Sequence, residues 1–197
     1  MLESLKDYIF VSNAIPREQC EILVKEISHR NIWESHTWQN YGKTLSKNNL
    51  KYPFKELDVA ESYPEQNKVI YPFMGQAINA YEQRLVESNS SDNFLANCGL
   101  HICCPVRFNR YNQHTLMRPH YDHIHSLFDG ERKGIPIISI VGVLNEDYEG
   151  GEFIFWDNYK VELHTGDILI FPSNFLYTHR VSAVKKGTRY SWVSWGW

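Results

Sequence analysis

The chain of 197 residues has little of what marks membrane, secreted or nucleic-acid-binding proteins. No apolar run approaches the roughly 18 residues of a membrane span, and the beginning, MLESLKDYIF, lacks the basic stretch and apolar core of a secretory signal. The 20 basic and 23 acidic residues are scattered and give a net charge of −3, which disfavours a nucleic-acid or anionic membrane surface. We therefore expect a soluble, cytoplasmic protein without a membrane partner. The oligomeric state stays open.

Cysteine is also scarce, and no C-x-x-C pair is present. The absence of that spacing argues against a zinc knuckle or a thioredoxin-type redox motif. We expect reduced, mostly buried thiols. The four cysteines are Cys20, Cys98, Cys103 and Cys104.

The first half of the chain has helical patterns. From Pro16, the residues Cys20, Leu23, Val24 and Ile27 recur at the spacing of one helical face, and a second helix is expected over residues 67–87. Residues 33–66 mix turn formers with aromatics, which indicates a long loop with short strands.

The second half consists of strand-like runs separated by Gly, Asp, Asn and Pro. They are LHICCPVRFNRY, IPIISIVGVLN, GEFIFW, DILIFP and RYSWVSWGW. Many short strands after a helical half indicate a mostly β fold, a barrel or sandwich buttressed by N-terminal helices.

A metal site is indicated by the spacing of His120 and Asp122. Two residues apart on an extended strand, both side chains leave the same face and can share one ion. His179, after an apolar run, is the best candidate for a third ligand. Two imidazoles and one carboxylate form the facial triad of non-haem Fe(II) sites, which leaves coordination positions open. An alternative pair, His123 and His125, has strand spacing suited to zinc or copper but no matched distal partner.

An anion site is indicated by Arg189, ten residues after His179. By period-two counting it shares a strand face with Ser191, Val193, Trp195 and Trp197. A buried guanidinium requires an anion, and the distal carboxylate of 2-oxoglutarate would supply it while the other end of the molecule chelates iron. Ser191 and a tyrosine hydroxyl are expected to assist.

The segments RYNQHTLMRPHYD, LNEDYEGGEFIF, HTGDILIFPS and HRVSAVKKGTRYSWVSW resemble, in order and spacing, the 2-oxoglutarate- and Fe(II)-dependent dioxygenases, within them the prolyl-4-hydroxylase-like branch. The resemblance runs from Arg110 to the C-terminus. It implies a double-stranded β-helix (jelly roll), Fe(II), 2-oxoglutarate and dioxygen as cofactor and cosubstrates, and the site residues His120, Asp122 and His179 (metal, catalytic), Arg189 and Tyr111 (cosubstrate) and Trp195 (mouth of the substrate site). One departure is the tripeptide His114-Thr115-Leu116, where relatives usually carry a glycine-containing turn.

The resulting hypothesis is a single domain over residues 1–197. Residues 1–97 are expected to form the helical support and a loop or lid region, and residues 98–197 the catalytic jelly roll. We expect a hydroxylase of a prolyl or other residue in a peptide or protein, which releases succinate and carbon dioxide. His123 is a further candidate for a substrate contact. The alternatives are a nucleic-acid dealkylating dioxygenase, which would carry a second arginine where Trp195 stands, and a non-catalytic jelly-roll module that binds a metal or a small ligand.

Overall fold

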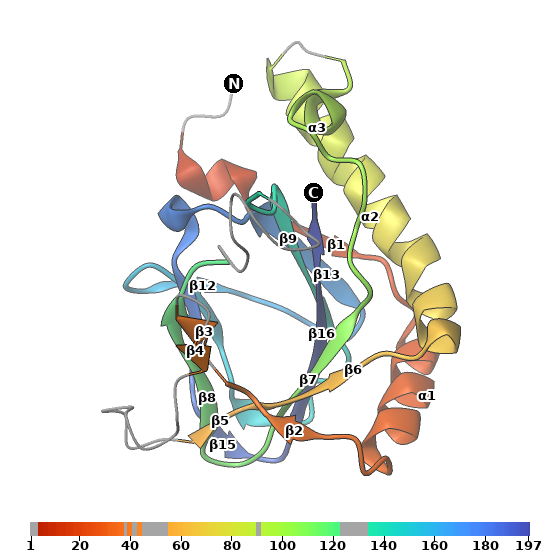
Figure 1. The fold of residues 1–197 in the computed structure, drawn as a ribbon, viewed down its shortest axis with the longest axis vertical. Coiled ribbons are helices and arrows are strands. Elements are labelled where there is room, and N and C mark those ends of the chain that lie inside the picture. The colour runs from red at the N-terminus through yellow and green to blue at the C-terminus, as the bar shows by residue number, and fades with distance from the viewer. Residues whose placement is uncertain (1–3, 38, 41–42, 45–54, 90–91, 123–133) are drawn as a thin grey trace.

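The computed structural model describes residues 4–37, 39–40, 43–44, 55–89, 92–122 and 134–197. Two β-sheets face each other, and two helices run along the outer side of one of them (Figure 1). None of the helices in these ranges is both long and apolar enough to cross a membrane. The architecture is therefore mostly β with N-terminal helices, as predicted.

The first half of the chain supplies the helices and the peripheral strands. They are η1 (Leu5–Tyr8), β1 (Phe10–Asn13), α1 (Arg17–Ser28), β2 (Glu34–Ser35), β3 (Gln39–Asn40), β4 (Lys43–Thr44), β5 (Lys55–Glu56), β6 (Asp58–Glu61), α2 (Pro64–Asn89) and α3 (Phe94–Asn97).

The second half supplies most of the sandwich. Its elements are β7 (Arg107–Tyr111), β8 (Thr115–His120), β9 (Ile138–Val143), β10 (Glu149–Gly150), β11 (Phe153–Phe155), β12 (Tyr159–Val161), β13 (Asp167–Pro172), η3 (Phe175–Tyr177), β14 (His179–Val181), β15 (Val184–Lys186) and β16 (Arg189–Gly196).

The larger sheet has seven strands in the order β1-β13-β9-β16-β7-β6-β2, and the smaller has five in the order β12-β11-β14-β8-β5. Neighbouring strands of the larger sheet are antiparallel. In the smaller sheet, β5 alone among the described strands runs parallel to its neighbour β8. Strands far apart in the sequence, such as β7 and β16, thereby become neighbours.

The central strands of the larger sheet are continuous apolar runs because an apolar core covers each face of the sheet. On β13, Ile168 and Ile170 pack toward α1 and α2, whereas Leu169 and Phe171 pack between the two sheets. Successive side chains of a strand point to opposite faces, so a sheet covered on both faces has no polar alternation. One core therefore lies between the larger sheet and the helices. The other lies between the two sheets, where it can surround a site.

The predicted helices are confirmed. α1 buries Cys20, Leu23 and Ile27, and α2 contains the whole of the expected residues 67–87. The expected first strand is shorter than its apolar run, because β7 starts only at Arg107, after Pro105, which has no N–H to donate to a ladder.

The strand that was expected to carry both His120 and Asp122 ends at His120. Its partner β14 starts at His179, directly opposite His120, so the ladder between these two strands ends at this pair. Asp122 lies just beyond the strand. Before β8, His114 has φ +67°, a left-handed conformation that favours glycine, which fits the glycine-containing turn of the family that the chain resembles.

Gly142 generates a stability prediction, because a Cβ at this position would lie 2.0 Å from the buried Trp192 ring. We expect Gly142→Ala to lower the free energy of unfolding by about 1–3 kcal/mol, the usual cost of overpacking a core. Gly75→Ala is the control, since α2 has open space there, and it should be neutral or stabilising by up to about 1 kcal/mol. Urea unfolding of both variants measures the difference, and equal stabilities would contradict the packing described.

Candidate active site

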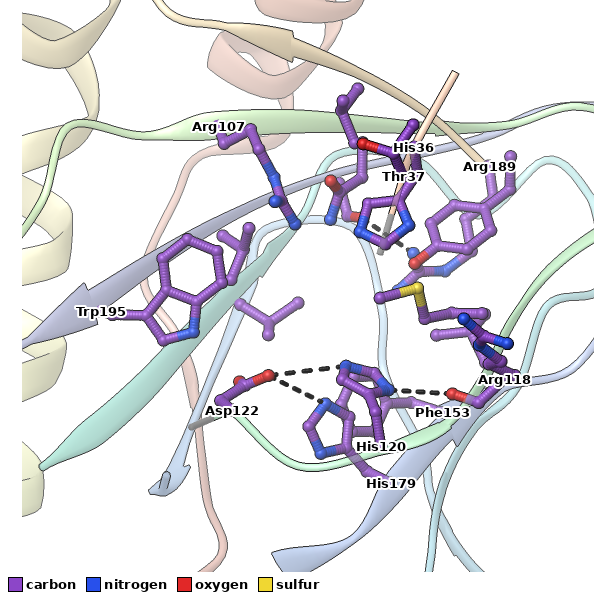
Figure 2. Close-up of a pocket in the computed structure, with 18 of the residues that line it drawn as sticks. His36, Thr37, Arg107, Arg118, His120, Asp122, Phe153, His179, Arg189 and Trp195 are labelled. Carbon is purple, nitrogen blue, oxygen red and sulfur yellow. Dashed lines mark hydrogen bonds and ion pairs between the residues drawn. The ribbon is translucent and has the colours of Figure 1, made fainter. Parts of the chain in front are cut away.

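A cavity of about 770 Å³ lies between the two sheets. Its walls come from β7, β9 and β16 of the larger sheet and from β8, β11 and β14 of the smaller one. Described residues of the 33–66 segment also line it, among them Glu34, His36 and Thr37. Figure 2 shows that charged side chains enter the cavity from several directions. The predicted site residues can therefore be followed around one cavity.

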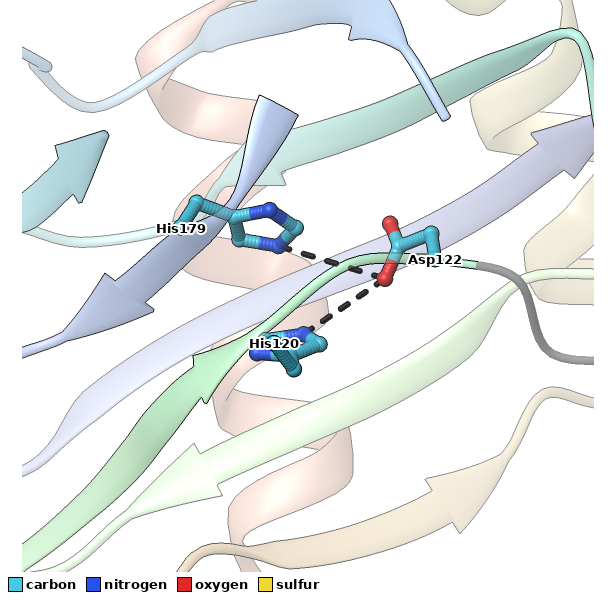
Figure 3. Close-up of side chains that lie close together, drawn as sticks. All are labelled: His120, Asp122 and His179. Carbon is cyan, nitrogen blue, oxygen red and sulfur yellow. Dashed lines mark ion pairs between the residues drawn. The ribbon is translucent and has the colours of Figure 1, made fainter. Parts of the chain in front are cut away.

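His120, Asp122 and His179 converge at one end of the cavity. The Asp122 Oδ1 atom lies 3.4 Å from His120 Nε2 and 3.9 Å from His179 Nε2. Both contacts are drawn as dashed lines in Figure 3. One ligand atom from each residue lies within 4.8 Å of the others. The antiparallel pairing of β8 with β14, which sets His120 opposite His179, brings the two imidazoles together.

Each of the two histidines is held by a backbone carbonyl two residues before it. His120 Nδ1 lies 2.9 Å from the carbonyl oxygen of Arg118, and His179 Nδ1 lies 3.0 Å from that of Tyr177. A carbonyl only accepts, so each Nδ1 carries the proton and donates it, which leaves each Nε2 lone pair directed toward Asp122. Burial, reinforced by His120, lowers the pKa of His179 to about 4, so its ring is neutral at physiological pH. Neutral imidazoles with fixed tautomers are what a metal ligand needs.

The Asp122 carboxylate is fixed by a pair of hydroxyls. Ser139 donates a 2.6 Å hydrogen bond to Asp122 Oδ2, and Ser139 and Ser173 share a 2.7 Å hydrogen bond. Burial raises the pKa of Asp122, but His179, His120 and the Ser139 hydroxyl outweigh it and hold this pKa below its usual range. The carboxylate is therefore ionised and has Oδ1 left for a metal. Neither serine was predicted as a site residue, although Ser139 stands out as a hydroxyl inside the apolar run IPIISIVGV.

This donor set fits Fe(II). Two neutral imidazole nitrogens and one ionised carboxylate oxygen come from one side, with the cavity on the other, as a 2-His-1-carboxylate site with open coordination positions requires. The hydrogen bonds from Nδ1 to carbonyls and from Ser139 to the carboxylate supply the outer contacts that orient such ligands.

Arg189 lies elsewhere on the cavity wall and is 1% exposed. Its Nη1 donates to Ser191 Oγ at 2.8 Å, and its guanidinium lies 5.0 Å from the centre of the Tyr111 ring. Burial raises the pKa of Tyr111 to about 12, although Arg189 and Arg107 act against it, so the phenol keeps its proton and can donate. Gly151 leaves room for the Arg189 side chain, since a Cβ there would lie 3.1 Å from Arg189 Cδ.

Among the described residues, Arg189 forms no ion pair, and its buried Nε has no hydrogen-bond partner. A buried guanidinium without a counter-charge is costly unless a ligand supplies one. Together with the Tyr111 phenol and the Ser191 hydroxyl, it fits a carboxylate. The residues present therefore suit the distal end of a dicarboxylate cosubstrate.

Trp195 also lines the cavity, whereas Trp192 does not, because it is buried between the larger sheet and the helices. Trp197 packs at the edge of the core between the sheets. His123 and His125 lie outside the described residues. Several other cavity residues were not predicted as site residues from the sequence, among them Arg107, Asn109 and His36. Period-two counting back from Tyr111 would have found the first two.

Residues 106–197 match the family model of the 2OG-Fe(II) oxygenase superfamily. A PKHD-type hydroxylase of Acinetobacter baumannii is 35% identical over 101 residues, which cover 48% of this chain and 44% of that protein. One from Idiomarina loihiensis is 38% identical over 93 residues, covering 46% and 40%. The matches thus span less than half the length of these curated relatives.

Solved structures resemble nearly the whole chain. A prolyl-4-hydroxylase of Pseudomonas putida superposes with a TM-score of 0.63 at 18% identity, covering 96% of this chain and 91% of that one. A prolyl hydroxylase of Trichoplax adhaerens, in complex with a hypoxia inducible factor peptide fragment, gives 0.68 at 13% identity, covering 97% and 84%. At these identities the likeness concerns the fold, which is the predicted jelly roll.

Residues 106–197, slightly less than half of the chain and most of the cavity wall, are thus similar to the 2OG-Fe(II) oxygenase superfamily. Within that superfamily, the chain is similar to the prolyl-4-hydroxylase-like branch.

The hydrogen bond from Ser139 to Asp122 generates a prediction about metal affinity. We expect Ser139→Ala to weaken metal binding about 10- to 100-fold, the usual effect of removing an outer partner of a ligand. Calorimetric titration with Mn(II), an air-stable substitute for Fe(II), measures it. Ser194→Ala is the matched control, because this buried hydroxyl donates to the Cys104 carbonyl instead. Equal affinities in wild type and Ser139→Ala would contradict the orienting role.

Proposed function

We propose that the protein is a 2-oxoglutarate- and Fe(II)-dependent dioxygenase that hydroxylates a C–H bond, with a prolyl residue of a peptide or protein as the leading substrate. The proposal assigns the metal to His120, Asp122 and His179, the cosubstrate to Arg189, Tyr111 and Ser191, and contact with the substrate to Trp195. It treats residues 1–197 as one catalytic domain, which the packing of α1 and α2 on the larger sheet supports. A cytoplasmic location is also part of the proposal, supported by four free thiols.

One observation carries the proposal. The same cavity holds a cluster of two imidazoles and a carboxylate and, separately, a buried arginine without a carboxylate partner among the described residues. A metal site with open positions and an anion site in one space suit a ligand that chelates with one end and carries a charge at the other. 2-Oxoglutarate has both features.

The residues of the chain would bind the metal and the cosubstrate, orient them, and limit the access of water. His120, Asp122 and His179 would hold Fe(II), and Ser139 would keep the Asp122 carboxylate from turning away. Arg189 and the protonated Tyr111 would hold the distal carboxylate and thereby fix the keto acid at the metal. Apolar side chains such as Val141 and Phe153, which line the cavity and belong to the core between the sheets, would limit the access of bulk water to the reacting atoms.

Bound there, Fe(II) supplies the redox chemistry by which dioxygen is reduced as 2-oxoglutarate is decarboxylated. The overall reaction balances: one oxygen atom enters succinate, the other enters the hydroxyl group of the product, and the carboxyl group next to the ketone leaves as carbon dioxide. The prolyl substrate rests on the similarity to PKHD-type and prolyl-4-hydroxylase proteins.

Turnover gives the direct test. We expect the iron-reconstituted protein to convert 2-oxoglutarate to succinate and to add one oxygen atom to a proline-containing peptide, as measured by mass spectrometry. Asp122→Ala should abolish both, because the metal loses its anionic ligand, whereas Asp157→Ala, on an exposed turn, should retain both.

The alternatives give other results in the same assay. Turnover stimulated by alkylated nucleic acid and by no peptide would favour a dealkylating enzyme. Metal binding without any release of succinate would favour a binding module. Normal turnover by Asp122→Ala would overturn the assigned metal site.

Arg189 generates a separate prediction. We expect Arg189→Met to raise the apparent KM for 2-oxoglutarate about 10- to 100-fold, because charge-assisted hydrogen bonds to the distal carboxylate are lost. Arg180→Met on β14 is the control, since Arg180 points outward to the Asp157 carbonyl. Succinate release at varied 2-oxoglutarate gives the values. An unchanged KM would contradict the assigned cosubstrate site.

A further inference from the structure

A second arginine, Arg107, faces the same cavity as Arg189. It starts β7, so Arg107, Asn109 and Tyr111 alternate onto the cavity face of that strand. Its guanidinium lies 5.0 Å from the centre of the Trp195 ring. In the view of Figure 2, Arg107 and Trp195 lie on the side of the cavity near Asp122, and Arg189 lies on the opposite side.

Among the described residues, Arg107 has no ion pair or hydrogen bond, and its Nε is buried without a partner. Two neighbouring arginines, in contrast, have carboxylate partners. Arg110, three residues further on β7, pairs with Asp58 at 3.0 Å, and Arg118 lies 3.6 Å from Glu56. Glu61 is opposite Arg107 in the strand register, but its side chain is exposed and forms no ion pair with Arg107.

Burial lowers the pKa of Arg107, although Tyr111, Asp122 and Glu61 act in the other direction. An arginine nevertheless keeps its proton in a protein. Its charge also contributes, after burial, to lowering the pKa of the nearby His36 to about 3. The guanidinium of Arg107 is thus a partly buried cation that packs against the indole ring of Trp195 and faces the cavity.

The proposed cosubstrate does not account for this charge. The charge balance of the occupied cavity rests on the proposed function. A divalent metal together with the ionised Asp122 carboxylate has a net charge of +1, and Arg189 and Arg107 add one positive charge each. The two carboxylates of 2-oxoglutarate neutralise two of these three charges. Among the described residues, Glu34 and Glu61 also line the cavity but form no ion pair with Arg107. One positive charge therefore remains without a carboxylate partner in this part of the chain, beside Trp195.

We propose that Arg107 is a specificity-determining residue that binds a carboxylate of the substrate near its reacting C–H bond. The substrate class is therefore a carboxylate-bearing peptide. The carboxylate is either the α-carboxylate of a C-terminal residue or the side chain of an acidic residue next to the target. A guanidinium presents a planar array of donors suited to either. The face of Trp195 keeps that array oriented.

The test compares matched peptides that differ by one charge. One pair is acetyl-alanyl-proline with a free carboxylate and its C-terminal amide. The other is acetyl-alanyl-prolyl-aspartate amide and the asparagine analogue. Binding is measured by calorimetry on the Zn(II)-substituted protein with 2-oxoglutarate, which needs no turnover. Wild type should bind the charged member of one pair about 10- to 100-fold more tightly, and that pair identifies the source of the carboxylate.

Variants connect the preference to Arg107. Arg107→Met should remove the preference, and Arg107→Lys should keep part of it, since lysine retains the charge without the planar array. Arg17→Met, with the same loss of charge at an exposed position on α1, should behave as wild type. Thermal unfolding of each variant checks the fold, and the KM for 2-oxoglutarate in uncoupled succinate release should stay unchanged in Arg107→Met.

Three results would overturn the inference while the proposed function stands. They are no preference for either charged peptide in wild type, a preference that survives in Arg107→Met, and a raised KM for 2-oxoglutarate in that variant, which would make Arg107 a cosubstrate residue. Failure of the proposed function has a different signature, because wild type would then release no succinate under any condition.

Discussion

The register between β8 and β14 sets the geometry of the site. Because His120 and His179 are directly opposite each other in one antiparallel pair, their rings lie within 4.2 Å, centre to centre. A shift of one residue would turn either imidazole to the other face of the sheet. Asp122 leaves the strand just beyond this pair and is captured from the facing sheet by Ser139. The metal cluster thus needs both sheets in place.

Charge is the second constraint. The cavity between the sheets accommodates Arg189 and Arg107 without carboxylate partners in the described part of the chain. Buried cations of this kind are costly to folding and are characteristic of sites that bind anions. The strand β16 places Arg189 and Trp195 on one face, and its neighbour β7 places Tyr111 and Arg107 there. Two adjacent strands therefore supply the residues proposed to bind both anions, the distal carboxylate of the cosubstrate and the carboxylate of the substrate.

Much of this arrangement was accessible from the sequence. The i, i+3, i+4 pattern predicted α1, the apolar runs predicted the main strands, and the residue spacing predicted that His120, Asp122 and His179 would converge. Period-two counting also placed Arg189, Ser191 and Trp195 on one face. These features depend on local periodicity or on motif spacing, which a sequence displays directly.

The rest depends on contacts across long distances in the chain. The end of β8 at His120 follows from where β14 begins, and the Ser139–Asp122 bond follows from how the two sheets face each other. Arg107 looked ordinary in the sequence, since an arginine at the start of a strand is usually solvated. That it forms no ion pair with any described carboxylate emerges only when β6, β7 and β16 are packed together.

If His120, Asp122 and His179 hold one iron ion inside the sandwich, X-ray absorption spectroscopy of the anaerobically reconstituted Fe(II) protein will detect these ligands. We expect one iron per chain with nitrogen and oxygen neighbours, an imidazole scattering pattern that weakens in His179→Ala, and no sulfur ligand. An iron with cysteine sulfur neighbours, or a spectrum unchanged by His179→Ala, would contradict this assignment.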